Sequence, residues 1–224
     1  KPANLTFGNP EKDEEDFHIF LPFSDLNGWV YEKETLSRAR RALQIERLGG
    51  VRSLSNAAYT YSINEDGKSE RIDFVDLTAT RLLHSLVVAR TMEAIMRNND
   101  FTEDEISIGV AASLLHDRGT PALGDATKAI DQKALHEEDY WWEGLDETAW
   151  KYLKNIGATR EMIDDIIHNQ GPLGEILNIA DRISYVMIDL WQMGERPLNP
   201  QLGNIYKDVV IDKDLLRSAS FKAT

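Results

Sequence analysis

The chain contains no cysteine, has fewer basic than acidic residues, and lacks a long hydrophobic run. Without cysteine it forms neither disulfides nor thiolate metal sites, so any metal must have nitrogen and oxygen ligands. The 25 Lys and Arg against 38 Asp and Glu leave a net charge of −13, which argues against non-specific binding to nucleic acid or an anionic membrane surface. No apolar run approaches the roughly 20 residues that span a bilayer, and no signal peptide is recognisable. We therefore expect a cytoplasmic protein without a membrane partner.

The 224 residues, 42% of them hydrophobic, are enough for one large globular domain. We expect an N-terminal arm over residues 1–35, a main domain over 36–195, and a C-terminal extension over 196–224 that packs on the same domain. The mixed and acidic composition of the first segment, with EKDEED at 11–16, is typical of a solvated arm.

Helical periodicity dominates the main domain, so the predicted fold class is mainly α. Helices are expected at 37–48, from about 78 to 98, and at 102–116, 136–155, 159–168 and 173–193. Thr102 followed by Glu105 is a capping-box pattern that opens the third of these helices. A small β-hairpin is expected within 57–74, where Asp66-Gly67 supplies a tight turn, and a weaker strand pattern covers 205–211.

Four possible metal ligands lie in, or at the end of, the apolar helical segments: His84, the adjacent pair His116-Asp117, and Asp181. A bare charge in such a place is costly unless it is paired or bound to a metal. Imidazole nitrogens with carboxylate oxygens are a donor set for a divalent transition metal, and they leave positions for water and substrate. Each residue alone has an ordinary structural explanation. Their combination predicts a metal that activates water against phosphorus.

This combination, Arg-x-x-His at 81–84, His-Asp at 116–117 and a late Asp181, resembles the HD-domain superfamily of metal-dependent phosphohydrolases. Over about residues 38–190 the chain is similar to the deoxynucleoside triphosphate triphosphohydrolases (dGTPase-like enzymes) within it. The resemblance implies an HD-domain helical bundle that holds one divalent ion from the set Mn, Mg, Fe, Co, Ni and Zn, without naming which. The ligands that it implies are His84, His116, Asp117 and Asp181.

Further motifs extend the resemblance to the substrate site. ARRALQIERLGG looks like the opening helix that lines the nucleoside pocket, and TRLLHS looks like the segment whose Arg meets phosphate. DRISYVMID matches a pattern in which the basic residue contacts phosphate, while Tyr and the second Asp hold the sugar hydroxyl. The resemblance thus assigns substrate binding to Arg47 (where the family usually has Gln), Leu48, Arg81, Arg182, Tyr185 and Asp189.

The segment after His-Asp departs from the family pattern. The family usually continues with Gly-His-x-x-Phe-x-His, whereas this chain has RGTPALGD, with Thr120 and Asp125 where histidines are expected. LHEE looks like a His-Glu pair that the family places beside the reacting phosphate. We therefore assign proton transfer to His136, oriented by Glu137 or another carboxylate. Asp125 is a second candidate if burial raises its pKa.

The expected reaction is hydrolysis of a deoxynucleoside triphosphate to a deoxynucleoside and triphosphate. Two alternatives stay open because the two histidines are missing. One is a 5′-nucleotidase-like HD enzyme that releases phosphate from a nucleoside monophosphate, and the other is a weakly active nucleotide-binding sensor. In each case we expect a nucleotide ligand, no nucleic-acid partner and a homo-oligomer.

Overall fold

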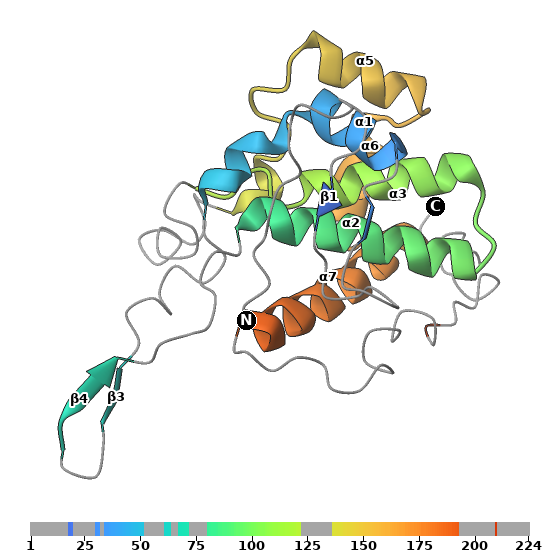
Figure 1. Cartoon of the computed structure of the whole chain (residues 1–224). Coiled ribbons are helices and arrows are strands. Elements are labelled where there is room, and N and C mark those ends of the chain that lie inside the picture. Colours follow the sequence, from blue (N-terminus) through green and yellow to red (C-terminus); the bar gives the residue numbers. More distant parts are fainter. Residues whose placement is uncertain are drawn as a thin grey trace.

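The computed structural model describes residues 18–19, 30–31, 34–51, 61–63, 67–71, 80–121, 136–192 and 209. In that part of the chain helices predominate, which confirms the mainly α fold class (Figure 1). None of the described helices is long and apolar enough to cross a membrane.

The helices are α1 (Glu34–Leu43), the 3-10 helix η1 (Ile45–Gly50), α2 (Arg81–Asn98), α3 (Glu103–Leu115), the 3-10 helix η3 (Glu137–Asp139), α5 (Glu147–Asn155), α6 (Arg160–Ile167) and α7 (Gly171–Gln192). Two short antiparallel strand pairs accompany them, β1 (His18–Ile19) with β2 (Val30–Tyr31), and β3 (Tyr61–Ile63) with β4 (Ser69–Arg71). The second pair confirms the predicted hairpin.

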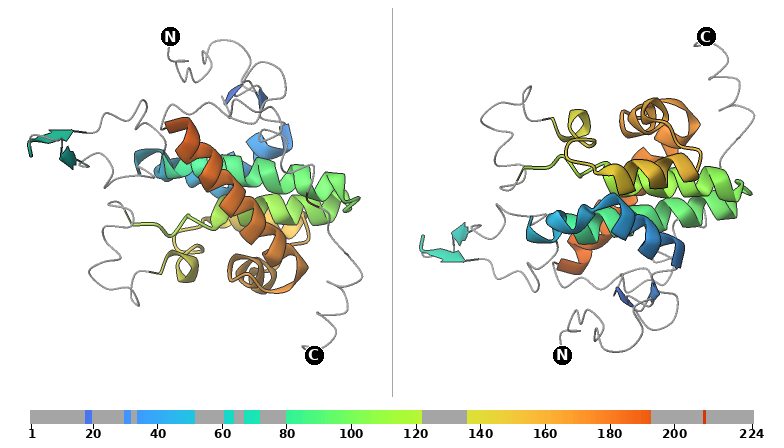
Figure 2. Two further views of the ribbon diagram at one scale, coloured as in Figure 1. Left: turned by 90° about the horizontal axis from the view of Figure 1, so that it is seen from below. Right: turned by 90° about the horizontal axis from the view of Figure 1, so that it is seen from above.

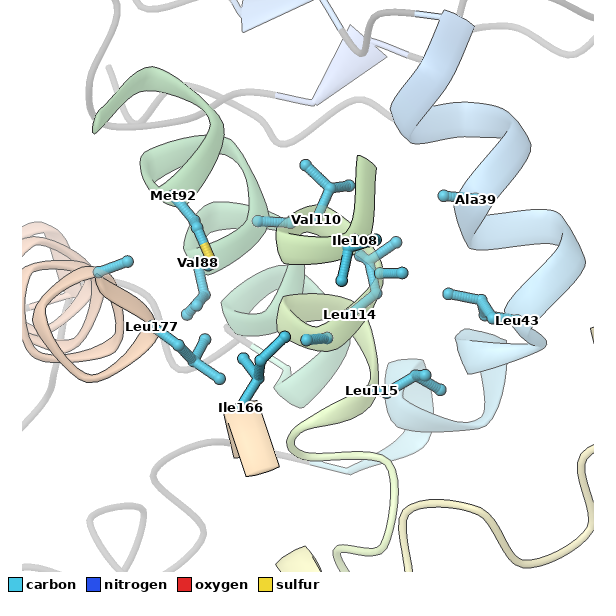
Figure 3. Close-up of a cluster of buried hydrophobic side chains, with 14 of the residues drawn as sticks. Ala39, Leu43, Val88, Met92, Ile108, Val110, Leu114, Leu115, Ile166 and Leu177 are labelled. Atoms are coloured by element: carbon cyan, nitrogen blue, oxygen red, sulfur yellow. The ribbon is translucent and has the colours of Figure 1, made fainter. Parts of the chain in front are cut away.

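Helices α2 and α3 form the centre of the bundle. They lie side by side, and α7 packs against α2 on another face, while α1 and α6 pack against α3 (Figures 1 and 2). The buried side chains of the described core are almost entirely aliphatic, and they include Val88 and Met92 from α2, Val110 and Leu114 from α3, and Leu177 from α7 (Figure 3). Full burial of each such side chain contributes roughly 1.5–3 kcal/mol. This packing fixes the relative positions of α2, α3 and α7.

Local signals explain where the central helices begin. The Thr80 hydroxyl accepts a hydrogen bond from the Leu83 amide at 3.2 Å and so caps α2. The predicted capping box of α3 is confirmed, because the Glu105 carboxylate accepts from the Thr102 amide at 2.8 Å and the Thr102 hydroxyl accepts from the Glu105 amide at 3.3 Å. The predictions for α2, α6 and α7 are also confirmed within a few residues.

Two predicted helices are interrupted. The helix expected at 37–48 ends at Leu43, because Gln44 adopts a left-handed conformation with φ 56° and the chain continues as η1. The helix expected at 136–155 is reduced to η3 and α5, which are separated by a turn with Gly144 at φ 69°. The Asp146 carboxylate then accepts from the Ala149 amide at 3.0 Å and begins α5 anew. Apolar periodicity alone does not reveal either break.

Several predictions fall on residues that the structure does not describe. These include most of the arm over 1–35 and of the segment over 196–224, the strand pattern at 205–211 apart from Val209, and Asp125. The Val209 carbonyl accepts a hydrogen bond from the Asn99 side chain at 2.9 Å. The division of the chain into arm, main domain and extension stays a prediction.

Candidate metal centre

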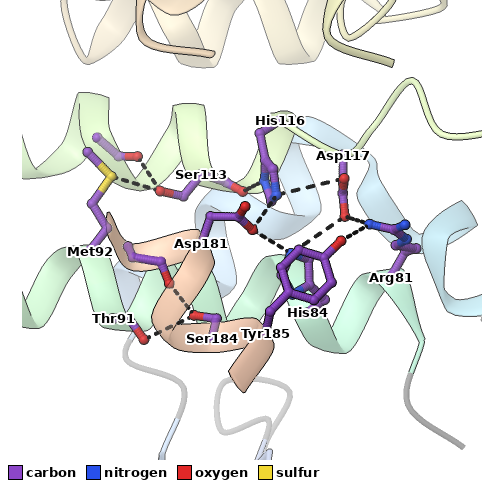
Figure 4. A network of polar contacts seen from close by, with 12 residues as sticks. Arg81, His84, Thr91, Met92, Ser113, His116, Asp117, Asp181, Ser184 and Tyr185 are labelled. Atoms are coloured by element: carbon purple, nitrogen blue, oxygen red, sulfur yellow. Dashed lines mark hydrogen bonds and ion pairs between the residues drawn. The ribbon is translucent and has the colours of Figure 1, made fainter. Parts of the chain in front are cut away.

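The four predicted ligands come from three helices that pack together. His84 lies in the first turn of α2, His116 and Asp117 follow the last residue of α3, and Asp181 lies in the middle of α7. Because α2 contacts both α3 and α7, the four side chains meet at one place (Figure 4). The possible ligand atoms of His84, His116 and Asp117 all lie within 4.8 Å of one another.

The distances between these atoms suit a single ion. Asp181 Oδ1 lies 2.8 Å from His84 Nε2 and 3.6 Å from His116 Nε2. Asp117 places Oδ2 3.8 Å from His84 Nε2, and Oδ1 3.8 Å from His116 Nε2. Ligand atoms that each lie about 2.0–2.2 Å from one ion are separated by roughly 3–4 Å. The observed spacing therefore matches that of ligands around one divalent ion.

The environment of His116 provides an independent test of this fit. Its Nδ1 lies 2.6 Å from the Ser113 carbonyl oxygen, which can only accept, so Nδ1 carries a hydrogen. The other ring nitrogen, Nε2, is buried and has no hydrogen-bond partner among the described residues. When His116 is neutral, its Nε2 lone pair faces two carboxylates, as a metal-binding histidine requires, and the Ser113 carbonyl fixes the orientation of the ring.

The same charges shift the pKa values of the metal-free protein. Burial acts to lower the pKa of His116, but the nearby carboxylates of Asp117 and Asp181 outweigh it and raise the pKa to about 9. Burial acts to raise the pKa of both carboxyls, and His116 and His84 outweigh it, so both pKa values fall below the ordinary range. Without metal at neutral pH, an imidazolium at His116 thus lies between two carboxylates.

Arg81 and Tyr185 surround these ligands. Arg81 is only 2% exposed, and its Nη1 donates to Asp117 Oδ2 at 3.0 Å and also to the Tyr185 hydroxyl. The Tyr185 ring packs against the His84 ring at a tilt of 36°, with ring centroids 4.1 Å apart (Figure 4). Helical spacing predicted that Asp181 and Tyr185 share a face of α7, and both indeed point at His84. The two residues assigned to the substrate by resemblance therefore also hold the metal ligands.

The other residues expected to bind substrate are more dispersed. Leu48 is fully buried in the core and exposes no surface to a ligand. Arg47 is exposed and donates to the backbone carbonyls of Thr120 and Arg118. Arg182 is exposed beside Asp181 and makes no hydrogen bond or ion pair with another described residue. Asp189 belongs to α7, but its side chain lies outside the described part of the structure.

His136 and Glu137, two of the three candidates for proton transfer, lie next to the turn that carries Asp117. The His136 side chain is 58% exposed and its Nδ1 lies close to the Glu138 carboxylate, whereas Glu137 is buried. A methyl group at Gly119 would lie within 3.0 Å of the Glu137 carbonyl carbon, so η3 packs directly on that turn. Asp125 lies outside the described residues.

Sequence reasoning missed the backbone contacts that shape the site. The Ser113 carbonyl, the glycine at 119 and the carbonyls bound by Arg47 are not visible as side-chain motifs. Only Ser113 had a usable signal, because a carbonyl three residues before a histidine at a helix end lies within reach of its ring.

Comparisons with known proteins identify structures with a similar fold, but they do not establish an activity. No family model matches the chain, and no curated protein does. A solved structure of a hypothetical protein from Aquifex aeolicus is similar with a TM-score of 0.61 at 20% identity, over 92% of this chain and 56% of that one. A structure from Bacteroides thetaiotaomicron, described as a phosphohydrolase, gives 0.60 at 20% identity, over 89% of this chain and 48% of that one.

The chain thus spans about half the length of both similar proteins. At this identity the likeness establishes the fold alone. It is a helical fold shared with a phosphohydrolase, which agrees with the expected HD-like bundle.

The first prediction concerns metal stoichiometry. The purified protein loaded with Mn²⁺ should contain about one equivalent per chain, as expected for a single open centre. His116→Ala or Asp181→Ala should abolish retention, because each removes a ligand that no described neighbour replaces. His168→Ala, which removes a histidine paired with Asp139 outside the cluster, should retain the metal. Full retention by both ligand variants in elemental analysis would refute the site.

The second prediction concerns protons. Because the pKa of His116 is raised to about 9, its imidazole is protonated at pH 7, and a metal must displace that proton to bind Nε2. Calorimetric titration with Mn²⁺ in buffers of different ionisation enthalpy should show about one proton released per ion at pH 7. The number should fall towards zero as the pH rises through about 9. Binding at pH 7 without proton release would contradict the proposed role of His116.

Proposed function

We propose that the protein is a metal-dependent phosphohydrolase that converts a deoxynucleoside triphosphate into a deoxynucleoside and triphosphate. The observation that carries this proposal is the convergence of His84, His116, Asp117 and Asp181 within the buried junction of α2, α3 and α7. The fold shared with a structure described as a phosphohydrolase supports the reaction class. The choice of substrate rests on the motifs around Arg81 and Asp181.

Two residues of the chain prepare the ligands for this chemistry. The Arg81 guanidinium holds Asp117 in place, and the Ser113 carbonyl keeps the proton of neutral His116 on Nδ1, so that Nε2 remains a lone-pair donor. A divalent ion bound there lowers the pKa of water and neutralises charge on a phosphate. The substrate would meet this centre from the side where Asp181 is partly exposed, since its side chain retains 29% exposure.

Phosphate binding falls to the cations on α2 and α7. Arg182 follows Asp181, is exposed, and has no hydrogen-bond or ion-pair partner among the described residues, so its guanidinium is available for a polyphosphate. Arg81 adds a buried positive charge at the centre itself. In a protein with a net charge of −13, these local cations and the ion are what attract an anionic substrate.

Sugar binding is assigned to Tyr185 together with Asp189. The Tyr185 ring rests on His84 and its hydroxyl accepts from Arg81, which places a polar group directly beside the metal ligands. Proton transfer to the leaving oxygen is assigned to His136, whose Nδ1 lies beside the Glu138 carboxylate. Asp125 stays a second candidate for that role.

A monophosphatase is the second candidate function, and one observation favours it. Thr120 stands where the resembling enzymes have a phosphate-contacting histidine, and its side chain is fully buried. A phosphate contact from this position is therefore missing, which would weaken a triphosphate more than a monophosphate. A nucleotide sensor with slow turnover is the third candidate. Under each of these functions we propose a homo-oligomer, which sedimentation of the purified chain would test.

The third prediction concerns products. Each of the four common deoxynucleoside triphosphates is incubated with the Mn²⁺-loaded protein, and the products are resolved by chromatography. Hydrolysis at the α-phosphorus should yield deoxynucleoside and intact triphosphate in equal amounts, without diphosphate or monophosphate intermediates. Asp117→Ala should be inactive, and Lys154→Gln, on the exposed end of α5, should match the wild type.

The alternatives predict different products in the same assay. Stepwise release of phosphate would contradict the triphosphohydrolase proposal. Phosphate from a monophosphate, with triphosphates left intact, would establish the second candidate instead.

The fourth prediction concerns the sugar. If Tyr185 contacts the 3′-hydroxyl, a 2′,3′-dideoxynucleotide should be a poorer substrate, because a buried polar group loses its partner. That loss costs roughly 1–3 kcal/mol, or about five-fold to over a hundred-fold in kcat/KM. Tyr185→Phe should reduce this discrimination, since the hydroxyl is gone for both substrates. Equal discrimination in wild type and variant would remove Tyr185 from the sugar site.

A further inference from the structure

Residues Asp117–Thr120 form a tight turn, here called the HD turn, that carries one metal ligand and is anchored to several distant segments. The turn closes on itself, because the Thr120 amide donates to the Asp117 carbonyl at 2.9 Å. It continues from α3 through the Arg118 amide, which donates to the Leu115 carbonyl at 2.9 Å. Since Asp117 begins the turn, any displacement of the turn moves this carboxylate relative to His84 and His116.

Arg47 anchors the HD turn from η1. Its Nη1 donates to the Thr120 carbonyl at 2.9 Å, and its Nη2 donates to the Arg118 carbonyl. The planar guanidinium thus spans two carbonyls of one turn, which an ammonium or amide group cannot do with the same geometry. Seventy-one and seventy-three residues of chain separate the partners, so these are bonds between segments rather than local contacts.

A second arginine, Arg118 of the HD turn itself, lies beside Arg47 and also binds backbone carbonyls. The Arg118 guanidinium is half-buried and lies near the positive charge of Arg47. Arg118 in turn donates to the Trp141 carbonyl at 3.0 Å and to the Glu143 carbonyl. Two cations so close together repel each other. Their proximity is offset by the four backbone carbonyls that they bind, which ties η1, the HD turn and residues 141–143 into one unit.

Movement of the HD turn towards η3 is also blocked. A methyl group at Gly119 would overlap the Glu137 carbonyl and lie within 3.0 Å of its carbonyl carbon. There is consequently no room for the turn to shift towards η3. Arg47 holds the turn from η1, and the backbone of Glu137 blocks its movement towards η3. The position of Asp117 is fixed by this pair of constraints together with its bond from Arg81.

We propose that Arg47 is a positioning residue of the metal centre, which acts through the HD turn on Asp117 and not through contact with the substrate sugar. Both hydrogen bonds that its guanidinium makes with described residues end on the turn, so both of its terminal nitrogens are engaged there. This inference rests on the proposed metal site, but not on the identity of the nucleotide. Arg47 would then act on a metal ligand, whereas the resemblance alone assigns it to substrate binding.

The test compares Arg47→Gln, Arg47→Lys and the exposed control Lys154→Gln with the wild type. Two quantities are measured without substrate: the affinity for Co²⁺ by titration, and the visible absorption spectrum of the Co²⁺-loaded protein, which reports ligand geometry. Arg47→Gln should weaken Co²⁺ binding by roughly ten- to a hundred-fold and alter the spectrum, as loss of a residue that orients a ligand does. Arg47→Lys keeps the charge but loses the fork, so its affinity should be intermediate.

Kinetics with the four deoxynucleoside triphosphates then separate positioning from substrate binding. A positioning role lowers kcat at saturating metal and leaves KM for the nucleotide within about two-fold. A raised KM with unchanged kcat, Co²⁺ affinity and spectrum would overturn the proposal in favour of substrate contact.

Failure of the proposed function and failure of the proposed role of Arg47 give different results. Absence of turnover by the wild type refutes the proposed function, while the Co²⁺ measurements still decide the role of Arg47. If Arg47→Gln does not fold, as judged by thermal denaturation, unchanged Co²⁺ affinity and spectrum in Arg47→Lys would overturn the proposal.

Discussion

The burial of opposite charges where α2, α3 and α7 meet is the constraint on which the site depends. Arg81 from α2 forms an ion pair with Asp117 at 3.0 Å, and His84 Nε2 from the same helix lies 2.8 Å from Asp181 Oδ1. Removing one partner of a buried pair typically costs about 3–5 kcal/mol, because the other charge is left uncompensated. The aliphatic packing of the three helices therefore has to keep these charged side chains in contact. Their pairing in turn restricts how closely, and at what angle, the helices pack.

Binding of a divalent ion would make the net charge of these side chains and the ion positive. In the metal-free protein at neutral pH, Arg81 and the protonated His116 balance the two carboxylates. A divalent ion that displaces the His116 proton leaves the centre with an excess of one positive charge. This excess lies in a low-dielectric junction, where its attraction for an anion is much stronger than at the surface. A phosphate is thus favoured locally although the chain as a whole is strongly acidic.

Sequence patterns predicted the main helices and the set of side chains that converge at the site. They did not predict the hydrogen bonds from side chains to backbone carbonyls. The capping box at Thr102 and the i, i+4 relation of Asp181 and Tyr185 are local relations, so they could be read directly. The left-handed Gln44 and the break before Asp146 depend on a few residues within otherwise periodic segments. The bonds from Arg47 to the HD turn join segments far apart in the chain and end on carbonyls, which every residue has. No side-chain motif encodes them.

The two sides of the metal centre consequently have different tasks. On the side of the HD turn, the fully buried Thr120 offers no exposed group, and the guanidinium of Arg47 is engaged with backbone carbonyls. On the side of α7, Asp181 is partly exposed, Arg182 is exposed, and the Tyr185 hydroxyl meets Arg81. Among the described residues, the groups suited to a polyphosphate and a sugar therefore lie along α7. If the proposed function holds, the turn would serve mainly to place Asp117, while α7 would supply both the ligand Asp181 and the polar groups that meet the substrate.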